Sequence, residues 1–216
     1  MNVNLLAPFQ TIPYFTIEGF KQISGIENPE YARIHLHRWA KAGHVLPLKR
    51  GVYMTRRFYE QHSADYLFSP TVSAILVPQS YVSLEFILQQ NNILTEVTYP
   101  ITCVTTKNTR KIVNDIGTFW YRHLRDDLYH GFTISEYHGI SVAQATLPKA
   151  LFDYLYLRPI SVTYRRLKID LAGELRLNLE EFSNTDRLEF ARLVEASSSL
   201  KMKDILLNFR RHIWQL

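Results

Sequence analysis

The chain has 216 residues, of which 46% are hydrophobic and 21% charged, so it can form packed cores and is neither disordered nor fibrous. Cys103 is the single cysteine, which excludes an intrachain disulfide and a cysteine-rich zinc site. The apolar runs are too short to cross a bilayer, and no basic segment followed by an apolar one opens the sequence. We therefore expect a soluble, cytoplasmic protein with one large or two small domains.

The formal excess of positive charge, +5 at pH 7, is confined to the first quarter of the chain. Residues 1–57 contain eight Lys or Arg and three Glu, whereas residues 58–216 contain 17 basic and 17 acidic residues. Such an asymmetry indicates an electrostatic partner for residues 1–57, such as nucleic acid. A solvated basic surface is the alternative that charge alone leaves open.

Two adjacent helices are expected near the N-terminus. Thr16 is a plausible N-cap for a helix that ends at Gly25. Asn28, followed by Pro29, is expected to begin a second helix that ends before Gly43. Apolar residues of the second helix at i, i+4 and i+7 should face the core, with polar and basic residues on the other side. These apolar residues are Ala32, Leu36 and Trp39.

A short hairpin is expected directly after the second helix, in which HVLPL and GVYM form two strands around a Lys-Arg-Gly tip. Two helices followed by a basic hairpin predict a winged helix-turn-helix over residues 1–57, whose second helix enters the major groove of DNA. Basic residues suit both elements because each neutralised phosphate releases counterions. An ordinary packing unit with a charged outer face is the alternative. The candidate DNA-binding residues are Arg33, His37, Arg38 and Lys41 on the helix, with Lys49 and Arg50 on the wing.

Residues 58–216 predict a second, mixed domain. Two helices are expected over residues 69–94, separated by Pro78. Strand patterns then predict a small antiparallel sheet, and ATLPKALFDYLYLR and most of the remainder have helical patterns. The expected fold class is therefore α+β: an N-terminal winged helix-turn-helix, followed by a mixed domain with a small antiparallel sheet and a helical C-terminal part. The strand patterns occupy residues 99–106, 117–124 and 132–143.

Four segments in order resemble the AbiEi-type antitoxins of bacterial type IV toxin–antitoxin systems. They are LHRWAKAGHVLPLKRGVYM, SYVSLEFIL, YPITCVTT and GISVAQATLPKALFDYLY. The last contains an A-x-x-x-K-A-L-x-D pattern typical of the family, with Lys149 and Asp153 in it. The resemblance implies a promoter-binding N-terminal domain that represses its own operon. It also implies a C-terminal domain that counteracts a nucleotidyltransferase-like toxin, and a protein that is not an enzyme.

Three residues are candidates for contact with a protein partner. Lys149 and Asp153 stand in the family pattern, although at i and i+4 they would also suit a surface ion pair. Trp120 lies between Phe119 and Tyr121, so both faces of this strand are aromatic. One face should belong to the core, which leaves the other as a possible partner surface.

Motifs that accompany common enzyme chemistry are missing from the sequence. It contains no Gly-rich phosphate loop, no GxSxG nucleophile elbow and no HExxH metal motif. No Glu or Asp is followed two residues later by Lys, so the [ED]xK element of restriction-type nucleases is missing as well. We therefore expect a protein that is not an enzyme and holds no metal or cofactor.

The sequence and the resemblance together favour a DNA-binding transcriptional repressor that is also an antitoxin, with operator DNA and a nucleotidyltransferase-like toxin as partners. Self-association on DNA would be compatible with this interpretation. Two alternatives stay open. One is a ligand-sensing or oligomerising winged-helix regulator without a toxin partner, and the other is a nuclease or transferase targeted to DNA by its helix-turn-helix.

Overall fold

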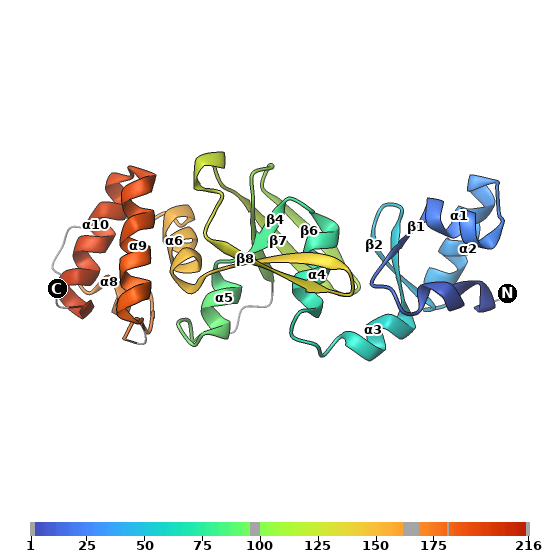
Figure 1. Cartoon of the computed structure of the whole chain (residues 1–216), viewed down its shortest axis with the longest axis horizontal. Coiled ribbons are helices and arrows are strands. Elements are labelled where there is room, and N and C mark those ends of the chain that lie inside the picture. Colours follow the sequence, from blue (N-terminus) through green and yellow to red (C-terminus); the bar gives the residue numbers. More distant parts are fainter. Residues whose placement is uncertain (1–2, 96–99, 162–168, 181, 215–216) are drawn as a thin grey trace. The chain divides into compact units, whose positions relative to one another are not determined.

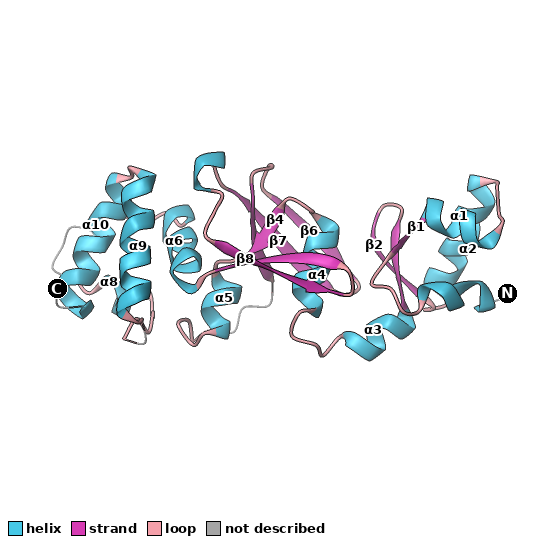
Figure 2. Cartoon of the chain, in the orientation of Figure 1, coloured by secondary structure: helices cyan, strands magenta, loops and turns pink. Residues whose placement is uncertain are grey.

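The computed structural model describes residues 3–95, 100–161, 169–180 and 182–214. Helices and strands are interspersed along the described chain (Figures 1 and 2), which confirms a mixed protein of α-helices and β-strands. The chain divides into two compact units that do not follow chain order. Unit 1 comprises Met1–Pro78, Ile112–Thr118 and Ser135–Val142, and unit 2 comprises Gln79–Lys111, Phe119–Ile134 and Ala143–Leu216.

Unit 1 begins with a 3-10 helical segment and a short strand, followed by two helices, a hairpin and two further helices. These elements are η1 (Val3–Phe9), β1 (Phe15–Thr16), α1 (Ile17–Ser24), α2 (Pro29–Lys41), β2 (Val45–Lys49), β3 (Val52–Thr55), α3 (Arg56–His62) and α4 (Phe68–Leu76).

Local sequence explains where α1 and α2 begin. Thr16 Oγ1 accepts a hydrogen bond from Gly19 N at 3.1 Å, and Asn28 Oδ1 accepts one from Glu30 N at 2.8 Å. Each side chain satisfies a backbone donor that the first turn of a helix leaves unpaired, so both predicted N-caps are confirmed. The predicted inner face of α2 is confirmed too, because its three members have no exposed surface: Ala32, Leu36 and Trp39.

The hairpin of β2 and β3 belongs to a three-stranded antiparallel sheet with the order β1-β3-β2. The predicted hairpin is therefore confirmed, and its turn contains Gly51 at a φ of 75°, a conformation that other residues adopt only under strain. The sheet and the helices share one core. In it Phe20 packs edge-on against Trp39 at 5.4 Å between ring centroids, and Phe9 packs against Phe15 at 4.4 Å.

A second sheet has six strands in the order β6-β7-β5-β4-β9-β8. β4 pairs antiparallel with β5, whereas β4 and β9 are parallel, as are β5 and β7. The expectation of a small antiparallel sheet is wrong, because long connections allow strands distant in sequence to pair in parallel. The strands are β4 (Ser80–Val82), β5 (Ile101–Thr105), β6 (Arg110–Asn114), β7 (Gly117–His123), β8 (Phe132–Tyr137) and β9 (Ile140–Ala145).

The helix expected after Pro78 begins only at Glu85, because Ser80–Val82 forms β4, and the other helices expected in the second half are largely confirmed. The helix predicted over ATLPKALFDYLYLR is α6, and α9 packs against both α6 and α10 (Figure 1). Part of the predicted helical tail, residues 162–168, lies outside the described residues. The helical elements are α5 (Glu85–Gln90), η2 (Asp126–Leu128), α6 (Leu147–Leu157), α8 (Leu171–Glu174), α9 (Asn184–Ser197), α10 (Leu200–Phe209) and the π-helical η3 (Arg210–Trp214).

Candidate functional site

Four of the six candidate DNA-binding residues lie on the exposed side of α2. With about 100° of rotation per residue, His37 and Lys41 lie on the side of the helix opposite Trp39, and Arg33 and Arg38 flank that side. Tyr31 and Ile34, which are 61% and 43% exposed, share this side. The helix therefore presents a cationic surface with two uncovered apolar side chains. The four exposed residues are Arg33, His37, Arg38 and Lys41.

Arg33 pairs with an acid on its own helix, and its charge also acts on a tyrosine of the hairpin. Its guanidinium forms an ion pair with Glu30, one turn earlier on the helix, and both side chains are mostly exposed. Burial raises the pKa of Tyr53 on β3, and the positive charge of Arg33 nearby opposes this rise. Tyr53 in turn stacks on Phe15 at 5.8 Å. The charge of Arg33 thus influences both its own helix and the hairpin residue Tyr53.

Lys49 and Arg50 are neighbours in the chain with different surroundings. Lys49 Nζ donates hydrogen bonds to the backbone oxygens of Ile75 at 2.7 Å and Leu76 at 3.0 Å, at the C-terminal end of α4. A cation at this end of a helix satisfies its last carbonyls and complements its dipole. Arg50 is exposed in the turn. The ammonium of Lys49 is therefore bonded to the end of α4 rather than presented at the tip of the hairpin.

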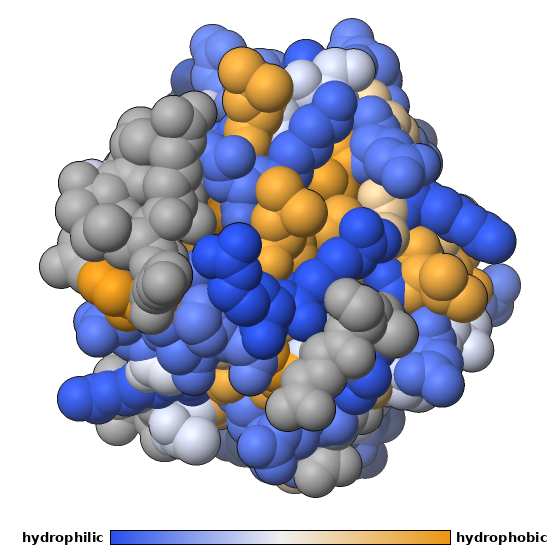
Figure 3. All heavy atoms as spheres, turned by 90° about the vertical axis from the view of Figure 1, so that its left-hand side faces the viewer, coloured by the Kyte–Doolittle hydropathy of each residue, from blue (hydrophilic) through white to orange (hydrophobic). Residues whose placement is uncertain are grey.

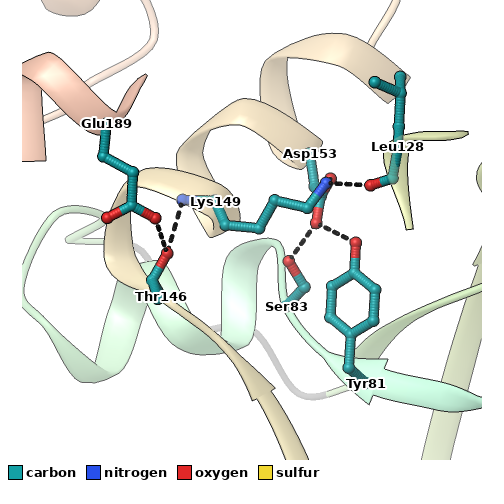
Figure 4. A network of polar contacts seen from close by, with 7 residues as sticks. All are labelled: Tyr81, Ser83, Leu128, Thr146, Lys149, Asp153 and Glu189. Carbon is teal, nitrogen blue, oxygen red and sulfur yellow. Dashed lines mark hydrogen bonds and ion pairs between the residues drawn. The ribbon is translucent and has the colours of Figure 1, made fainter. Parts of the chain in front are cut away.

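A buried polar network lies in unit 2 around Lys149 and Asp153 of α6, neither of which has exposed surface. Figure 4 shows Lys149 Nζ bonded to Asp153 Oδ1 at 2.7 Å and to the backbone oxygen of Leu128 at 2.9 Å. Asp153 Oδ2 accepts from Tyr81 Oη and from Ser83 Oγ, each at 2.8 Å. The network therefore joins α6 to the end of β4 and to η2.

The start of α6 is fixed by a second set of contacts. Thr146 Oγ1 accepts from the backbone nitrogen of Lys149 at 3.4 Å and donates to Glu189 Oε1 of α9 at 2.7 Å (Figure 4). Gly131 has a φ of 78°, and a Cβ there would lie 3.1 Å from Cδ of Lys149. The stem of Lys149 thus packs directly on backbone, and α9 holds the cap of the helix that carries it.

Burial and pairing act in opposite directions on this ion pair. Burial lowers the pKa of Lys149 and raises the pKa of Asp153, because each charged form loses water, and the attraction between the two charges opposes both shifts. The pKa of Tyr81 is raised by burial and then by the Asp153 carboxylate, so its hydroxyl stays a donor. The alternative of a surface ion pair is wrong, and so is the prediction of partner contact, because neither Lys149 nor Asp153 reaches the surface.

Trp120, the third candidate for contact with a protein partner, lies on the surface, unlike Lys149 and Asp153. Phe119 and Tyr121 are fully buried while Trp120 is 39% exposed, so the predicted alternation of β7 is confirmed. Arg122 lies over the indole with its Cζ 5.2 Å from the ring centroid. The i, i+2 spacing on one strand makes this neighbour detectable from sequence. Tyr81, by contrast, stands 72 residues from Asp153, and no local pattern indicates the contact.

The surface around α9 and α10 combines charged and apolar side chains. Figure 3 shows apolar side chains among hydrophilic ones on the face that these helices form. Apolar side chains are common on the surfaces of folded proteins, so this face does not by itself define a site. The exposed leucines of the two helices are Leu188, Leu200 and Leu207, which are 60%, 73% and 62% exposed.

No protein-family model and no curated protein matches the chain. Among the helices that the structure describes, none has both the length and the apolar character needed to cross a membrane. Within the same ranges, no group of three or more His, Cys, Asp or Glu side chains is arranged to hold a metal ion.

Proposed function

We propose that the chain is a DNA-binding transcriptional repressor in which residues 1–57 act as a winged helix-turn-helix. The observation that carries this proposal is the row of exposed cations on α2, next to a hairpin that presents Arg50. The order of elements supports it, since α1 and α2 precede the hairpin and β1 completes a three-stranded sheet. In winged helix-turn-helix domains the second helix enters the major groove and the hairpin lies beside it.

Each cation has a role that follows from its chemistry. Arg33 and Arg38 suit bidentate contacts with guanine or phosphate, because the guanidinium presents paired donors in one plane. Lys41 and Arg50, near the end of α2 and in the hairpin turn, suit contacts with the phosphate backbone. Glu30 holds Arg33 in the unbound protein through their ion pair. Its carboxylate can also accept a hydrogen bond from cytosine.

A second role as an antitoxin of a type IV system is supported by the resemblance of the sequence. In this role the protein represses its own operon and counteracts a nucleotidyltransferase-like toxin. The family pattern contains Lys149 and Asp153, and their burial supports a structural reason for it, namely that the pair fixes α6 in unit 2. Growth rescue from the product of a neighbouring nucleotidyltransferase gene would distinguish an antitoxin from a regulator without a toxin.

DNA binding is tested by fluorescence anisotropy with a labelled duplex from the region upstream of the coding sequence and a scrambled duplex of equal length. We expect the protein to prefer the upstream duplex. Arg33→Ala and Arg38→Ala should each reduce this preference by about 1–3 kcal/mol, the value of a bidentate base contact. Lys41→Ala should weaken binding to both duplexes and flatten the dependence of log K on log salt by about one unit.

The matched control is Arg192→Ala, which removes an exposed arginine from α9 in unit 2. It should bind both duplexes like the parent. Equal affinity of the parent for the two duplexes would refute the repressor, and α2 variants that bind like Arg192→Ala would place the DNA-binding surface elsewhere.

A further inference from the structure

A pocket of about 420 Å³ opens in unit 2 beside Trp120. It lies between β7, the start of α5 and the C-terminal end of α6, and its volume falls within the range of small-molecule sites. Its lining combines three kinds of residue: a partly exposed tryptophan, two arginines and one glutamate. These are Trp120, Arg122, Arg158 and Glu85.

The two arginines of the pocket are held in place without an acidic partner. Arg122 Nη2 donates to the backbone oxygen of Leu157 at 3.0 Å, and Arg158 Nη1 donates to Tyr154 Oη at 2.7 Å. Each guanidinium also lies over an aromatic ring. Across the part of the chain that the structure describes, no carboxylate lies within ion-pair distance of either one. The pocket therefore contains two positioned positive charges that an anion would neutralise.

The indole of Trp120 gives the pocket a flat apolar surface. Its neighbours Phe119 and Tyr121 are buried in the core, yet Trp120 keeps 39% of its surface exposed. The guanidinium of Arg122 lies over the ring, with its Cζ 5.2 Å from the ring centroid. A partly exposed aromatic surface is suited to stacking with a flat ring of a ligand.

The position of Glu85 depends on a strained residue. Leu84 has a φ of 61° and a ψ of −140°, a conformation that is costly for a residue with a Cβ. Hydrogen bonds on both sides hold it there: Ser83 Oγ donates to Asp153, and the backbone nitrogen of Phe86 donates to Thr102 Oγ1 at 3.0 Å. Strain of this kind persists where the surrounding structure fixes it, often at ligand sites. Glu85, which follows Leu84 directly, lines the pocket.

We propose that this pocket binds a nucleotide. The base stacks on Trp120, the phosphate is bound by Arg122 and Arg158, and Glu85 accepts a hydrogen bond from an N–H group of the base. A bare phosphate would leave the indole unused, and an apolar ligand would leave two positive charges unpaired, so a flat ring joined to an anion fits the whole set. This inference goes beyond the proposed DNA-binding function and does not rest on it, because the residues and the unit differ.

The test is a titration of the full-length chain with AMP, GMP, CMP and UMP, followed by calorimetry and by tryptophan fluorescence. Trp39 and Trp214 are buried, so a change in emission on binding reports chiefly on Trp120. We expect saturable binding of at least one mononucleotide. Inorganic phosphate and the matching nucleoside should each bind at least about tenfold more weakly, since each lacks one half of the recognised chemistry.

Variants of the exposed residues separate binding from folding. Trp120→Ala and Arg158→Gln should each weaken the mononucleotide about tenfold or more, while Trp120→Phe, which keeps a ring, should lose less. Arg192→Gln is the control and should bind like the parent, and thermal unfolding should show that all four variants fold. Lack of saturable binding, equal binding of inorganic phosphate, or unchanged affinity in Trp120→Ala would each overturn the proposal.

Discussion

The cations of α2 and the cation of α6 belong to the same residue types but lie in opposite environments. Arg33 and Lys41 keep their charges in water, where a partner can use them. Lys149 has no exposed surface, and its ammonium is bonded to Asp153 and to a backbone oxygen. Burial therefore decides whether a charge serves recognition or the fold, and helical spacing does not.

The difference in environment also changes what each ion pair contributes to stability. Glu30 and Arg33 are exposed one turn apart, and such pairs contribute between nothing and about 1 kcal/mol because water screens them. Lys149 and Asp153 have both left water, so each charge depends on the other. Removal of one partner from the buried pair leaves an uncompensated charge in the core.

The largest expected effect comes from breaking the buried pair. Lys149→Met and Asp153→Leu should each lower the free energy of unfolding by about 3–5 kcal/mol, because the remaining charge is left without its partner. The double variant should lose less than the sum of the two, since it removes both charges together. Urea denaturation of the parent and the three variants measures this coupling.

Glu30→Gln is the matched control for the exposed pair. It should change the free energy of unfolding by less than about 1 kcal/mol. If the double variant loses as much free energy of unfolding as the two single variants together, the charges of Lys149 and Asp153 do not depend on each other. The buried pair would then not differ from the exposed pair of α2 in this respect.

Lys49 and Arg50 of the hairpin allow the same comparison between a cation bonded within the fold and an exposed cation, with smaller expected effects. Lys49→Met should destabilise unit 1, since Lys49 Nζ bonds the last carbonyls of α4, and should leave the salt dependence of DNA binding unchanged. Arg50→Gln should instead affect DNA binding and not stability. It should flatten the slope of log K against log salt by about 0.9, the value of one phosphate contact, without lowering the unfolding temperature.

Anisotropy over a salt series gives the salt slope of each variant, and thermal unfolding gives its unfolding temperature. A flattened slope in Lys49→Met would mean that its ammonium leaves α4 to bind phosphate. An unchanged slope in Arg50→Gln would remove the hairpin from the proposed DNA contacts.

The sequence predicts those features that depend on neighbours in the chain. The caps at Thr16 and Asn28, the buried stripe around Trp39 and the alternation at Trp120 all follow from spacing of a few residues. The engagement of Lys49 is not predictable in this way, because its acceptors stand 26 and 27 residues further along the chain.

The second sheet and the buried network could not be predicted from local sequence patterns either, because they too depend on residues that are distant in the chain. Ser80–Val82 follows Pro78 within a segment with a helical pattern, yet it forms β4 because β5 and β9 lie on either side of it. The spacing of Lys149 and Asp153 is equally good for a surface pair. Only the packing of α9, β4 and η2 around α6 makes the pair internal.

An intermediate case between the exposed and the buried pairs is found at Asp65 in unit 1. Its carboxylate is exposed, but it accepts hydrogen bonds from the hydroxyl of Tyr137 on β8 and from His62 Nδ1 at 3.0 Å. These bonds, with Tyr137 first, lower the pKa of Asp65 below its ordinary value. A carboxyl whose folded pKa is lowered stabilises the fold above its unfolded pKa, and this contribution is lost as the pH falls through the folded pKa.

Tyr137→Phe removes the main cause of that shift and should raise the pKa of Asp65 toward the ordinary value near 4. Carbon-13 NMR of the Asp65 carboxyl during an acid titration measures it directly. Tyr31→Phe, which alters an exposed tyrosine on α2, should leave the Asp65 titration as in the parent. The loss of stability in Tyr137→Phe should be smaller than the losses predicted for the Lys149–Asp153 pair and for Lys49→Met, because water screens the exposed carboxylate of Asp65. If the pKa of Asp65 stays low in Tyr137→Phe, the shift is caused by His62. The Asp65 site would then be an exposed ion pair of the same kind as Glu30 and Arg33 on α2.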